Sequence, residues 1–252
     1  MTSQVQKAKS FRKLHVPSEP LILFNIWDPG SATAVGEAGA KALATSSWAV
    51  SESNGYTDGE HTPLAFVMEN LRRIVEATEL PVTVDLESGY GNTPKKVGET
   101  IGLALKAGAI GCNLEDSFPE NGSLRKTAQQ VDRIRQARQR ADEANVPFFI
   151  NARTDVFIQV SQKEHNGALV AQALERAHAY AEAERFDFRA KHQRIPVLDL
   201  WELKGNLAAR SIGLRVCRTG SKQTCGKHRT GTMSKTAHRT FPKCRQYTII
   251  AS

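Results

Sequence analysis

Three apolar runs in the first two thirds of the chain end in clusters of polar side chains. Residues 82–88 read Val-Thr-Val-Asp-Leu-Glu-Ser, residues 111–117 read Gly-Cys-Asn-Leu-Glu-Asp-Ser, and residues 148–155 read Phe-Phe-Ile-Asn-Ala-Arg-Thr-Asp. In a parallel barrel the C-terminal ends of the strands and the loops after them form one face, which holds the active site. Polar groups that repeatedly follow predicted strands therefore indicate an enzyme.

Five predicted strands each precede a predicted helix between residues 21 and 183. The expected strands are 21–27, 42–47, 82–88, 111–117 and 148–155, and the expected helices are 31–38, 64–77, 95–106, 127–144 and 167–183. Ser31 is the expected cap of the first helix, and residues 51–59 are expected to form a polar loop. Serial βα units predict a parallel sheet with right-handed crossovers, and their even spacing favours an α/β fold of the (β/α)8 TIM-barrel type.

The charge balance divides the chain near residue 184. Residues 1–183 carry 19 Lys and Arg against 22 Asp and Glu, whereas residues 184–252 carry 15 against 4. A sixth strand is due near residue 185, but the sequence there is too charged to be buried on both faces. We therefore expect a barrel portion at 1–183 with the active-site motifs, and a basic, atypical and poorly ordered tail at 184–252.

The start of the chain and its apolar runs favour a cytoplasmic protein. No apolar run approaches the roughly 20 residues that a membrane-spanning helix needs. Residues 1–13 are polar and mildly basic, without the apolar stretch of a signal peptide,. We expect no membrane association.

Five motifs together resemble the isocitrate lyase and phosphoenolpyruvate mutase superfamily, in particular its carboxyvinyl-carboxyphosphonate phosphorylmutase and oxaloacetate decarboxylase-like branch. They are Phe-Asn-Ile-Trp-Asp at 24–28, Ala-Thr-Ser-Ser at 44–47, Asp-Leu-Glu-Ser-Gly-Tyr-Gly at 85–91, Asn-Leu-Glu-Asp at 113–116 and Asn-Ala-Arg-Thr-Asp at 151–155. The resemblance implies a (β/α)8 barrel, a Mg²⁺ ion with Mn²⁺ as the alternative, and a homo-oligomer. It also implies chemistry on small 2-oxo or 2-hydroxy carboxylates through an enolate-like intermediate.

Asp85, Glu87 and Glu115 are the candidate metal ligands. Mg²⁺ prefers oxygen ligands, keeps several waters and is usually held by one or two carboxylates. The resemblance makes Asp85 the direct ligand and lets the other two act through water. Arg153 can hold an acid group of the substrate with two parallel hydrogen bonds. Asp58, Glu115 and Arg153 form the expected catalytic set.

The remaining candidates would contact the substrate. By resemblance, Ser46 and Ser47 donate to its carboxylate, and Asp58 works close to the reacting centre from a mobile loop that excludes water when it closes. Trp27 either lines the substrate pocket or packs beneath it. Cys112 is expected in the core, because free Cys is among the most buried residue types. Asp116 and Asp155 are expected to cap helices or support the structure.

The loop at 117–123, Ser-Phe-Pro-Glu-Asn-Gly-Ser, bears on the substrate. In isocitrate and methylisocitrate lyases the corresponding loop contains Lys and Cys. The group that serves those lyases as an acid is missing from the loop of this chain. Mutases and phosphonopyruvate hydrolases resemble this loop through Asn121 and Ser123, but their usual Lys is absent. The leading hypothesis is a lyase or decarboxylase that cleaves a C–C bond in oxaloacetate or a substituted malate. P–C chemistry by a mutase or hydrolase is the alternative.

Two interpretations of the tail remain. A nucleic-acid-binding extension would use the clustered Lys and Arg, but aromatic residues are scarce, and the spacings of the three cysteines and two histidines after residue 216 match no compact zinc pattern,. The other is a shift of reading frame near residue 184. If the codons for residues 186–190 are read one base forward, they can encode Ser-Ile-Phe-Val-Pro, which resembles the superfamily's sixth strand. The chain would then be an inactive remnant without its last three βα units.

Overall fold

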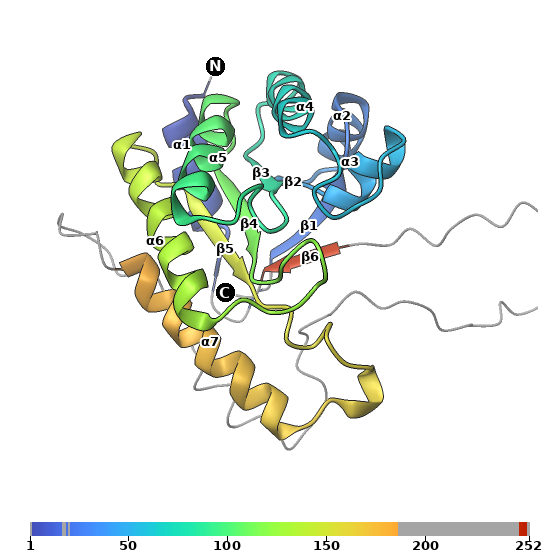
Figure 1. Cartoon of the computed structure of the whole chain (residues 1–252). Helices are drawn as coiled ribbons and strands as arrows, with labels where there is room; N and C mark the ends of the chain where they lie inside the picture. The colour runs from blue at the N-terminus through green and yellow to red at the C-terminus, as the bar shows by residue number, and fades with distance from the viewer. Residues whose placement is uncertain (1, 17–18, 20, 186–246, 251–252) are drawn as a thin grey trace, which may run out of the picture.

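Five parallel strands form a sheet in which the strands lie in sequence order (Figure 1). The structure, a computed structural model, describes residues 2–16, 19, 21–185 and 247–250. The strands are β1 (Leu21–Ile26), β2 (Leu43–Thr45), β3 (Val82–Asp85), β4 (Gly111–Glu115) and β5 (Phe149–Arg153). β6 (Tyr247–Ile250), which the sequence did not predict, pairs antiparallel with β1. The sixth strand due near 185 and most of the tail lie outside the described residues.

The helices follow the strands around one face of the sheet. They are α2 (Pro29–Glu37), α3 (Ser47–Ser53), α4 (Leu64–Glu76), α5 (Pro94–Lys106), α6 (Thr127–Glu143) and α7 (Gly167–Arg185), with a short 3₁₀ helix, η1 (Gln162–Glu164), before α7. α2 packs against α4, α4 against α5, α5 against α6, and α6 against α7. Such a continuous wall of helices is the outer layer of a barrel, whereas a doubly wound sheet carries helices on both faces. The fold is therefore of the predicted α/β barrel type.

Two local predictions were wrong at their boundaries. α2 begins at Pro29 and is capped by Asp28, whose Oδ1 accepts a hydrogen bond from the Ser31 backbone N at 2.6 Å, while Ser31 Oγ accepts from Asp28 N at 3.1 Å. This capping box makes Ser31 the third helical residue rather than the cap. The loop expected at 51–59 starts later, because the Ser46 side chain caps α3, which continues to Ser53.

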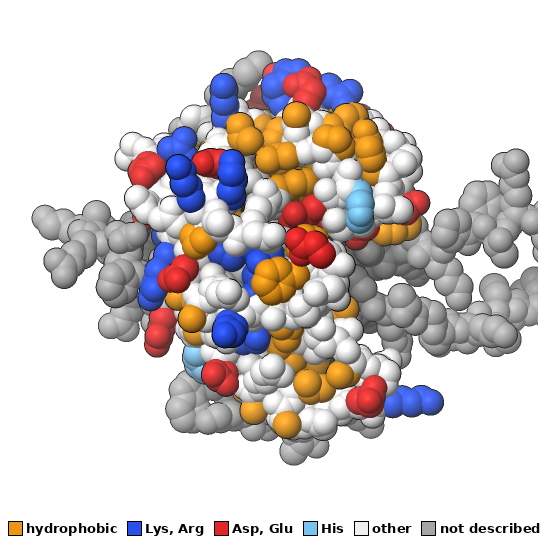
Figure 2. All heavy atoms as spheres, viewed as in Figure 1, with side chains coloured by type: hydrophobic (Ala, Val, Ile, Leu, Met, Phe, Trp, Pro, Cys, Tyr) orange, Lys and Arg blue, Asp and Glu red, His pale blue; other side chains and the backbone are white. Residues whose placement is uncertain are grey.

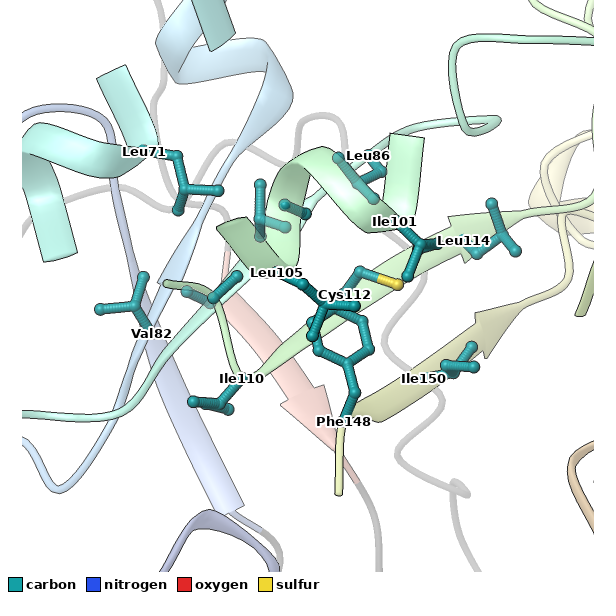
Figure 3. Packing of buried hydrophobic residues seen from close by; sticks show 14 of the residues in the cluster. Leu71, Val82, Leu86, Ile101, Leu105, Ile110, Cys112, Leu114, Phe148 and Ile150 are labelled. Carbon is teal, nitrogen blue, oxygen red and sulfur yellow. The ribbon is translucent and has the colours of Figure 1, made fainter. Parts of the chain in front are cut away.

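The core lies between the sheet and the helices. Cys112 of β4 is fully buried there, as expected, and Figure 3 shows it close to Ile101, Leu105 and Phe148. A large apolar side chain in such a position stabilises the fold by about 1.5–3 kcal/mol. Gly111 is needed where β4 meets β5, because a Cβ there would lie 2.7 Å from the Phe149 carbonyl oxygen. Among the described helices, none is long and apolar enough to cross a membrane.

α1 (Gln4–Lys13) packs across the amino ends of the strands. Gln4 Nε2 donates to the carbonyls of Leu105 and Ala109 at 2.8 and 2.7 Å, just before β4 begins. Phe11 is fully buried and meets the Phe149 ring edge-on at 5.4 Å. α1 therefore closes the end of the sheet opposite the polar strand ends. The sequence did not predict this helix.

A buried polar network fastens α7 to the loops after β4 and β5. Asp116 is fully buried, and its Oδ2 accepts hydrogen bonds from Arg176 Nη1 at 3.0 Å, Tyr180 Oη at 2.8 Å and Thr154 Oγ1 at 2.8 Å. Its Oδ1 accepts from the backbone N of Asp155 at 2.8 Å. A buried carboxylate needs such partners to offset its lost hydration. Asp116 therefore has the expected supporting role, and it fixes the backbone beside Arg153.

We predict that Arg176→Met lowers the free energy of unfolding by about 3–5 kcal/mol, because it removes one partner of a buried ion pair. Urea denaturation measures the change. Arg72→Met is the matched control: Arg72 pairs with Glu69 and Glu76 on the surface of α4, where a pair contributes about 0–1 kcal/mol. Equal losses in the two variants would contradict the role given to the network.

His15 makes the stability of the fold depend on pH. Its ring stacks on Phe149 at 4.5 Å, and its Nε2 is buried without a hydrogen-bond partner in the described structure. Burial lowers the pKa of His15, and the charge on Arg12 lowers it further, although hydrogen bonding to the Phe11 carbonyl acts in the opposite direction. The unfolded chain therefore binds a proton at His15 more readily than the folded chain does, so stability falls as the pH drops below about 6.5.

We predict that His15→Phe flattens the decline in the free energy of unfolding between about pH 7.5 and pH 5, because the variant has no imidazole to protonate at this place. Urea denaturation at several pH values measures the slope. His178→Phe, at an exposed position on α7, should keep the slope of the unchanged protein. An unchanged slope in His15→Phe would show that other groups cause the decline.

Candidate functional site

The parallel register brings the polar ends of β3, β4 and β5 together. Asp85 lies beside Asn113, and Glu115 lies beside Arg153. Side chains two residues apart on a strand share a face, so Asn113 and Glu115 point to the same side of β4. Asn151 Nδ2 donates to Asn113 Oδ1 at 2.8 Å on that side. The register therefore places Asp85, Glu115 and Arg153 at one edge of the sheet.

Arg153 links two of the acids. Its guanidinium forms an ion pair with Glu115 through Nη1, and its Nε donates to Asp155 Oδ1 at 2.7 Å. Asp155 is also bound by the Ser117 hydroxyl. The Arg153 side chain is still 38% exposed. A positive group with both a fixed position and access to solvent is suited to bind an anionic ligand.

Asp85 contacts the start of α3. Its Oδ2 accepts from Ser47 Oγ at 3.1 Å and from the Ser47 backbone N at 3.4 Å, while its own backbone N donates to Thr45 Oγ1 at 2.9 Å. Ser47 thus binds the predicted metal ligand itself. Ser46 caps the same helix by accepting a hydrogen bond from the Ala49 backbone N. Their expected role as donors to a substrate carboxylate stays a prediction.

Glu87 points at the loop that carries Asp58. Its Oε2 accepts from the backbone N of Gly59 at 2.8 Å and of Glu60 at 2.7 Å, and its Oε1 accepts from Tyr90 Oη at 3.2 Å. Glu87 has φ +51°, so it does not continue the alternation of β3. The turn after β3 and the loop after α3 therefore meet above the strand ends.

The acids of this site raise one another's pKa values. Burial raises the pKa of Glu87 to about 7, with help from Asp58 and Asp85. Burial also raises the pKa of Glu115, which Asp85 and Asp155 raise further while Arg153 lowers it. For Asp58 the carboxyl group's burial is again the largest cause of a raised pKa, and Ser47 opposes it by hydrogen bonding. A crowd of acids with so little neutralising charge favours binding of a cation or of protons.

The candidate metal ligands are not a preformed set. In the part of the chain that the structure describes, no group of three or more His, Cys, Asp or Glu side chains is arranged to hold a metal ion. The contacts above explain this, because Glu115 pairs with Arg153 and Glu87 with backbone amides. The donor chemistry nevertheless suits a hard divalent cation, since carboxylate oxygens are the ligands that Mg²⁺ takes. The Asp85 carboxylate accepts from one hydroxyl and two backbone amides and pairs with no cation in the described structure, so it could turn toward a metal ion.

Three other predicted residues lie apart from these contacts. Trp27, at the end of β1, is 39% exposed, and its carbonyl accepts a hydrogen bond from Asn70 Nδ2. Asn121 and Ser123 are exposed and bind each other, with Ser123 Oγ donating to Asn121 Oδ1 at 2.7 Å. The structure gives none of the three a contact with the acids, so their roles at a substrate remain predictions.

The sequence analysis missed Glu60 and Tyr90. Glu60 Oε1 accepts from Ser88 Oγ at 2.7 Å and from the Tyr90 backbone N at 2.8 Å. Asp-Gly-Glu at 58–60 reads only as a surface turn, so the sequence carried no signal for this contact.

A small cavity beneath the turn is lined by Ser47, Asp85, Glu87 and Tyr90 together with apolar side chains of α4. In Figure 2, acidic side chains gather near the middle of the face, between hydrophobic side chains and a histidine.

Comparisons with known proteins agree with the arrangement of these motifs. The profile of the family described as phosphoenolpyruvate phosphomutase matches residues 11–183. 2-Methylisocitrate lyase of Escherichia coli K12 is 30% identical over 184 residues, which cover 69% of this chain and 58% of the relative. This chain spans a little over half the length of the first curated relatives that it matches.

Two solved structures show the same fold. The crystal structure of a proposed phosphonomutase from Burkholderia cenocepacia J2315 has a TM-score of 0.70 and 55% identity, and the match covers 72% of each chain. That of 2,3-dimethylmalate lyase, a member of the PEP mutase/isocitrate lyase superfamily, has a TM-score of 0.61 and 26% identity over 73% of this chain and 61% of the other. The family match covers every motif of the site, and the chain belongs to the phosphoenolpyruvate phosphomutase family of the isocitrate lyase and PEP mutase superfamily.

Proposed function

We propose that this protein is a Mg²⁺-dependent lyase or decarboxylase that breaks a C–C bond in a small 2-oxo or 2-hydroxy carboxylate. The observation that carries the proposal is the grouping of Asp85, Glu115 and Arg153 at the carboxyl edge of three neighbouring strands. Its relatives include 2-methylisocitrate lyase and 2,3-dimethylmalate lyase, both of which are named as lyases. An enolate-like intermediate is the common requirement of such cleavage.

The residues of the site would divide the work. Arg153, already held by Asp155 and partly exposed, binds a substrate carboxylate, which would compete with Glu115 for the guanidinium. Asp58, on the loop above Ser47, faces the reacting centre, and burial raises its pKa, which suits a group that accepts and returns a proton during the reaction,. The loop that carries it excludes water from the reactive intermediate.

Asp85 would hold Mg²⁺ directly, and Glu87 and Glu115 would act through its waters, with Mn²⁺ as an alternative ion. When bound, the cation supplies the positive charge that stabilises an enolate, which contributes several kcal/mol. Asp85 can turn toward a cation without leaving a charged partner behind, because its carboxylate accepts from the Ser47 hydroxyl and from the backbone amides of Ser47 and Glu87. Glu115 would have to bind the waters of the ion while its carboxylate keeps the ion pair with Arg153.

P–C bond chemistry by a phosphonate mutase or hydrolase is the second candidate. The proposed phosphonomutase from Burkholderia cenocepacia supports it, because the two chains are 55% identical. Both reactions develop negative charge beside a carboxylate, so the same acids and Arg153 serve either one. Side chains that contact the leaving group of the substrate would decide whether a C–C or a P–C bond is broken.

We predict that the protein releases pyruvate, or the corresponding 2-oxo acid, from one of oxaloacetate, alkylmalates or phosphonopyruvate, and that EDTA abolishes the activity while Mg²⁺ restores it. Asp85→Asn should lower kcat/KM at least about 100-fold, as expected for loss of a group that stabilises transition-state charge. Asp132→Asn, at an exposed position on α6, is the matched control and should change kcat/KM less than about twofold. With phosphonopyruvate as the sole substrate, hydrolysis to pyruvate and phosphate or isomerisation to phosphoenolpyruvate would select the second candidate.

A third candidate is an inactive remnant. The family match ends at residue 183, where the chain becomes basic, and this chain covers 58% of the Escherichia coli relative. β6 pairs antiparallel with β1, whereas a closed (β/α)8 barrel has parallel neighbours throughout. A shift of reading frame near residue 184 would account for these features together. Absence of activity in folded protein would favour this candidate.

We predict that the coding DNA, read one base forward from about codon 184, encodes segments that resemble strands six to eight of the superfamily. Sequencing the gene and its transcript across this codon tests the prediction. A chain read in that frame should fold with a higher free energy of unfolding than the present one, because closing the barrel would cover the edge of β5, which has no partner strand among the described residues,. Failure to recover three further apolar, strand-like runs in that frame would end the hypothesis.

A further inference from the structure

Two turns beside the site hold each other through two glutamates. Glu87 Oε2 accepts the backbone N–H groups of Gly59 and Glu60 at 2.8 and 2.7 Å. In return, Glu60 Oε1 accepts from Ser88 Oγ at 2.7 Å and from the Tyr90 backbone N at 2.8 Å. Each carboxylate thus binds donors that the other turn supplies. We name this reciprocal set of four hydrogen bonds, between residues 59–60 and 87–90, the double-glutamate clamp.

Backbone conformation shows that the clamp is under constraint. Glu60, Glu87 and Tyr90 have φ values of +62°, +51° and +53°, a region that residues other than glycine seldom adopt. Such conformations persist only where the surrounding structure fixes them, and they concentrate at active sites. The four hydrogen bonds of the clamp are among the contacts that fix these three residues in place.

One side of the clamp is anchored and the other is not. Arg133 of α6 is fully buried and donates to the carbonyls of Ser88 and Gly91, which ties the turn after β3 to the helix wall. The loop that carries Asp58 is exposed over residues 54–58. Its ties to the anchored turn are the bonds made by Glu60 and Glu87. Loss of the Glu60 carboxylate would remove two of these four bonds, so the loop would open more often while the turn stays in place.

We propose that Glu60 is a positioning residue that holds the Asp58 loop against the turn after β3 and so keeps Asp58 beside Ser47 and Asp85. Glu60 does not touch the reacting atoms, and it acts through the loop. The effect on catalysis rests on the proposed function, whereas the effect on the loop does not. Glu87 holds the same loop through the backbone amides of Gly59 and Glu60, in addition to its predicted role at the metal.

Hydrogen exchange measured by mass spectrometry on a peptide that covers residues 56–62 tests the clamp without any substrate. In Glu60→Ala, the amides of Gly59 and Glu60 should exchange at least about tenfold faster, because the loop opens more often. Glu60→Gln keeps an oxygen acceptor and should stay within about threefold of the unchanged protein. Glu52→Ala, at an exposed position on neighbouring α3, is the matched control and should not change the exchange.

Ser88→Ala provides a second, milder variant if Glu60→Ala fails to fold. It removes one of the two donors to Glu60 and should raise exchange by a smaller factor than Glu60→Ala. Circular dichroism and thermal melting confirm that each variant is folded. Unchanged exchange in folded Glu60→Ala, or unchanged exchange in Ser88→Ala when only that variant folds, overturns the clamp whether or not the protein is an enzyme.

The activity arm uses the substrate that the unchanged protein turns over. Glu60→Ala should lower kcat about tenfold or more with little change in KM, and Glu60→Gln should recover most of it, because a loop that positions a proton-transfer group acts on the chemical step. Faster exchange with unchanged kcat overturns the positioning role and leaves the clamp as a structural feature. If the unchanged protein turns over no substrate, the proposed function fails, and the exchange result alone decides the clamp.

Discussion

Carboxylates crowd one edge of the parallel sheet with few cations to neutralise them, and much of the local structure follows from this constraint. Arg153 is shared between Glu115 and Asp155, so one guanidinium serves two acids. Glu87 has backbone amides in place of a cation. Burial and mutual repulsion raise the pKa values of Glu87 and Glu115. Such a site binds a divalent cation or protons more readily than isolated acids would, because either one relieves the repulsion.

Stability and chemistry lie at opposite ends of the strands. α1 covers the amino ends with buried Phe11, and the helices α2, α4, α5, α6 and α7 pack one on the next around the sheet. The carboxyl ends carry the loops, the exposed part of Arg153 and the contacts of the clamp. Barrel folds separate the two functions in this way because the loops at the carboxyl face can change without disturbing the packed layers. The network around Asp116 joins the two regions, since it ties α7 to the backbone next to Arg153.

Membership in the phosphoenolpyruvate phosphomutase family rests on residues 11–183, and all the site residues discussed here fall within that range. The relatives are longer than the matched part, and this chain continues with a basic segment of different composition. Five βα units are enough to bring together the acids of the site, Arg153 and the loop that carries Asp58. Substrate discrimination and turnover depend also on how the remaining edge of the sheet is completed, because an open edge leaves strand hydrogen-bonding groups unpaired.

The sequence by itself determined the five βα units and the acids that meet at one edge. Helical periodicity located α4, α5 and α6 to within a residue or two, and the parallel order of the strands made Asp85, Glu115 and Arg153 neighbours. The sequence alone did not decide which of two nearby residues, Asp28 or Ser31, caps the start of α2. Only the tertiary structure decided the direction of Glu87, because a positive φ breaks the alternation of side chains along β3. It alone revealed Glu60, whose partners lie 28 and 30 residues away, since hydrogen bonds between two turns leave no periodic trace in a sequence.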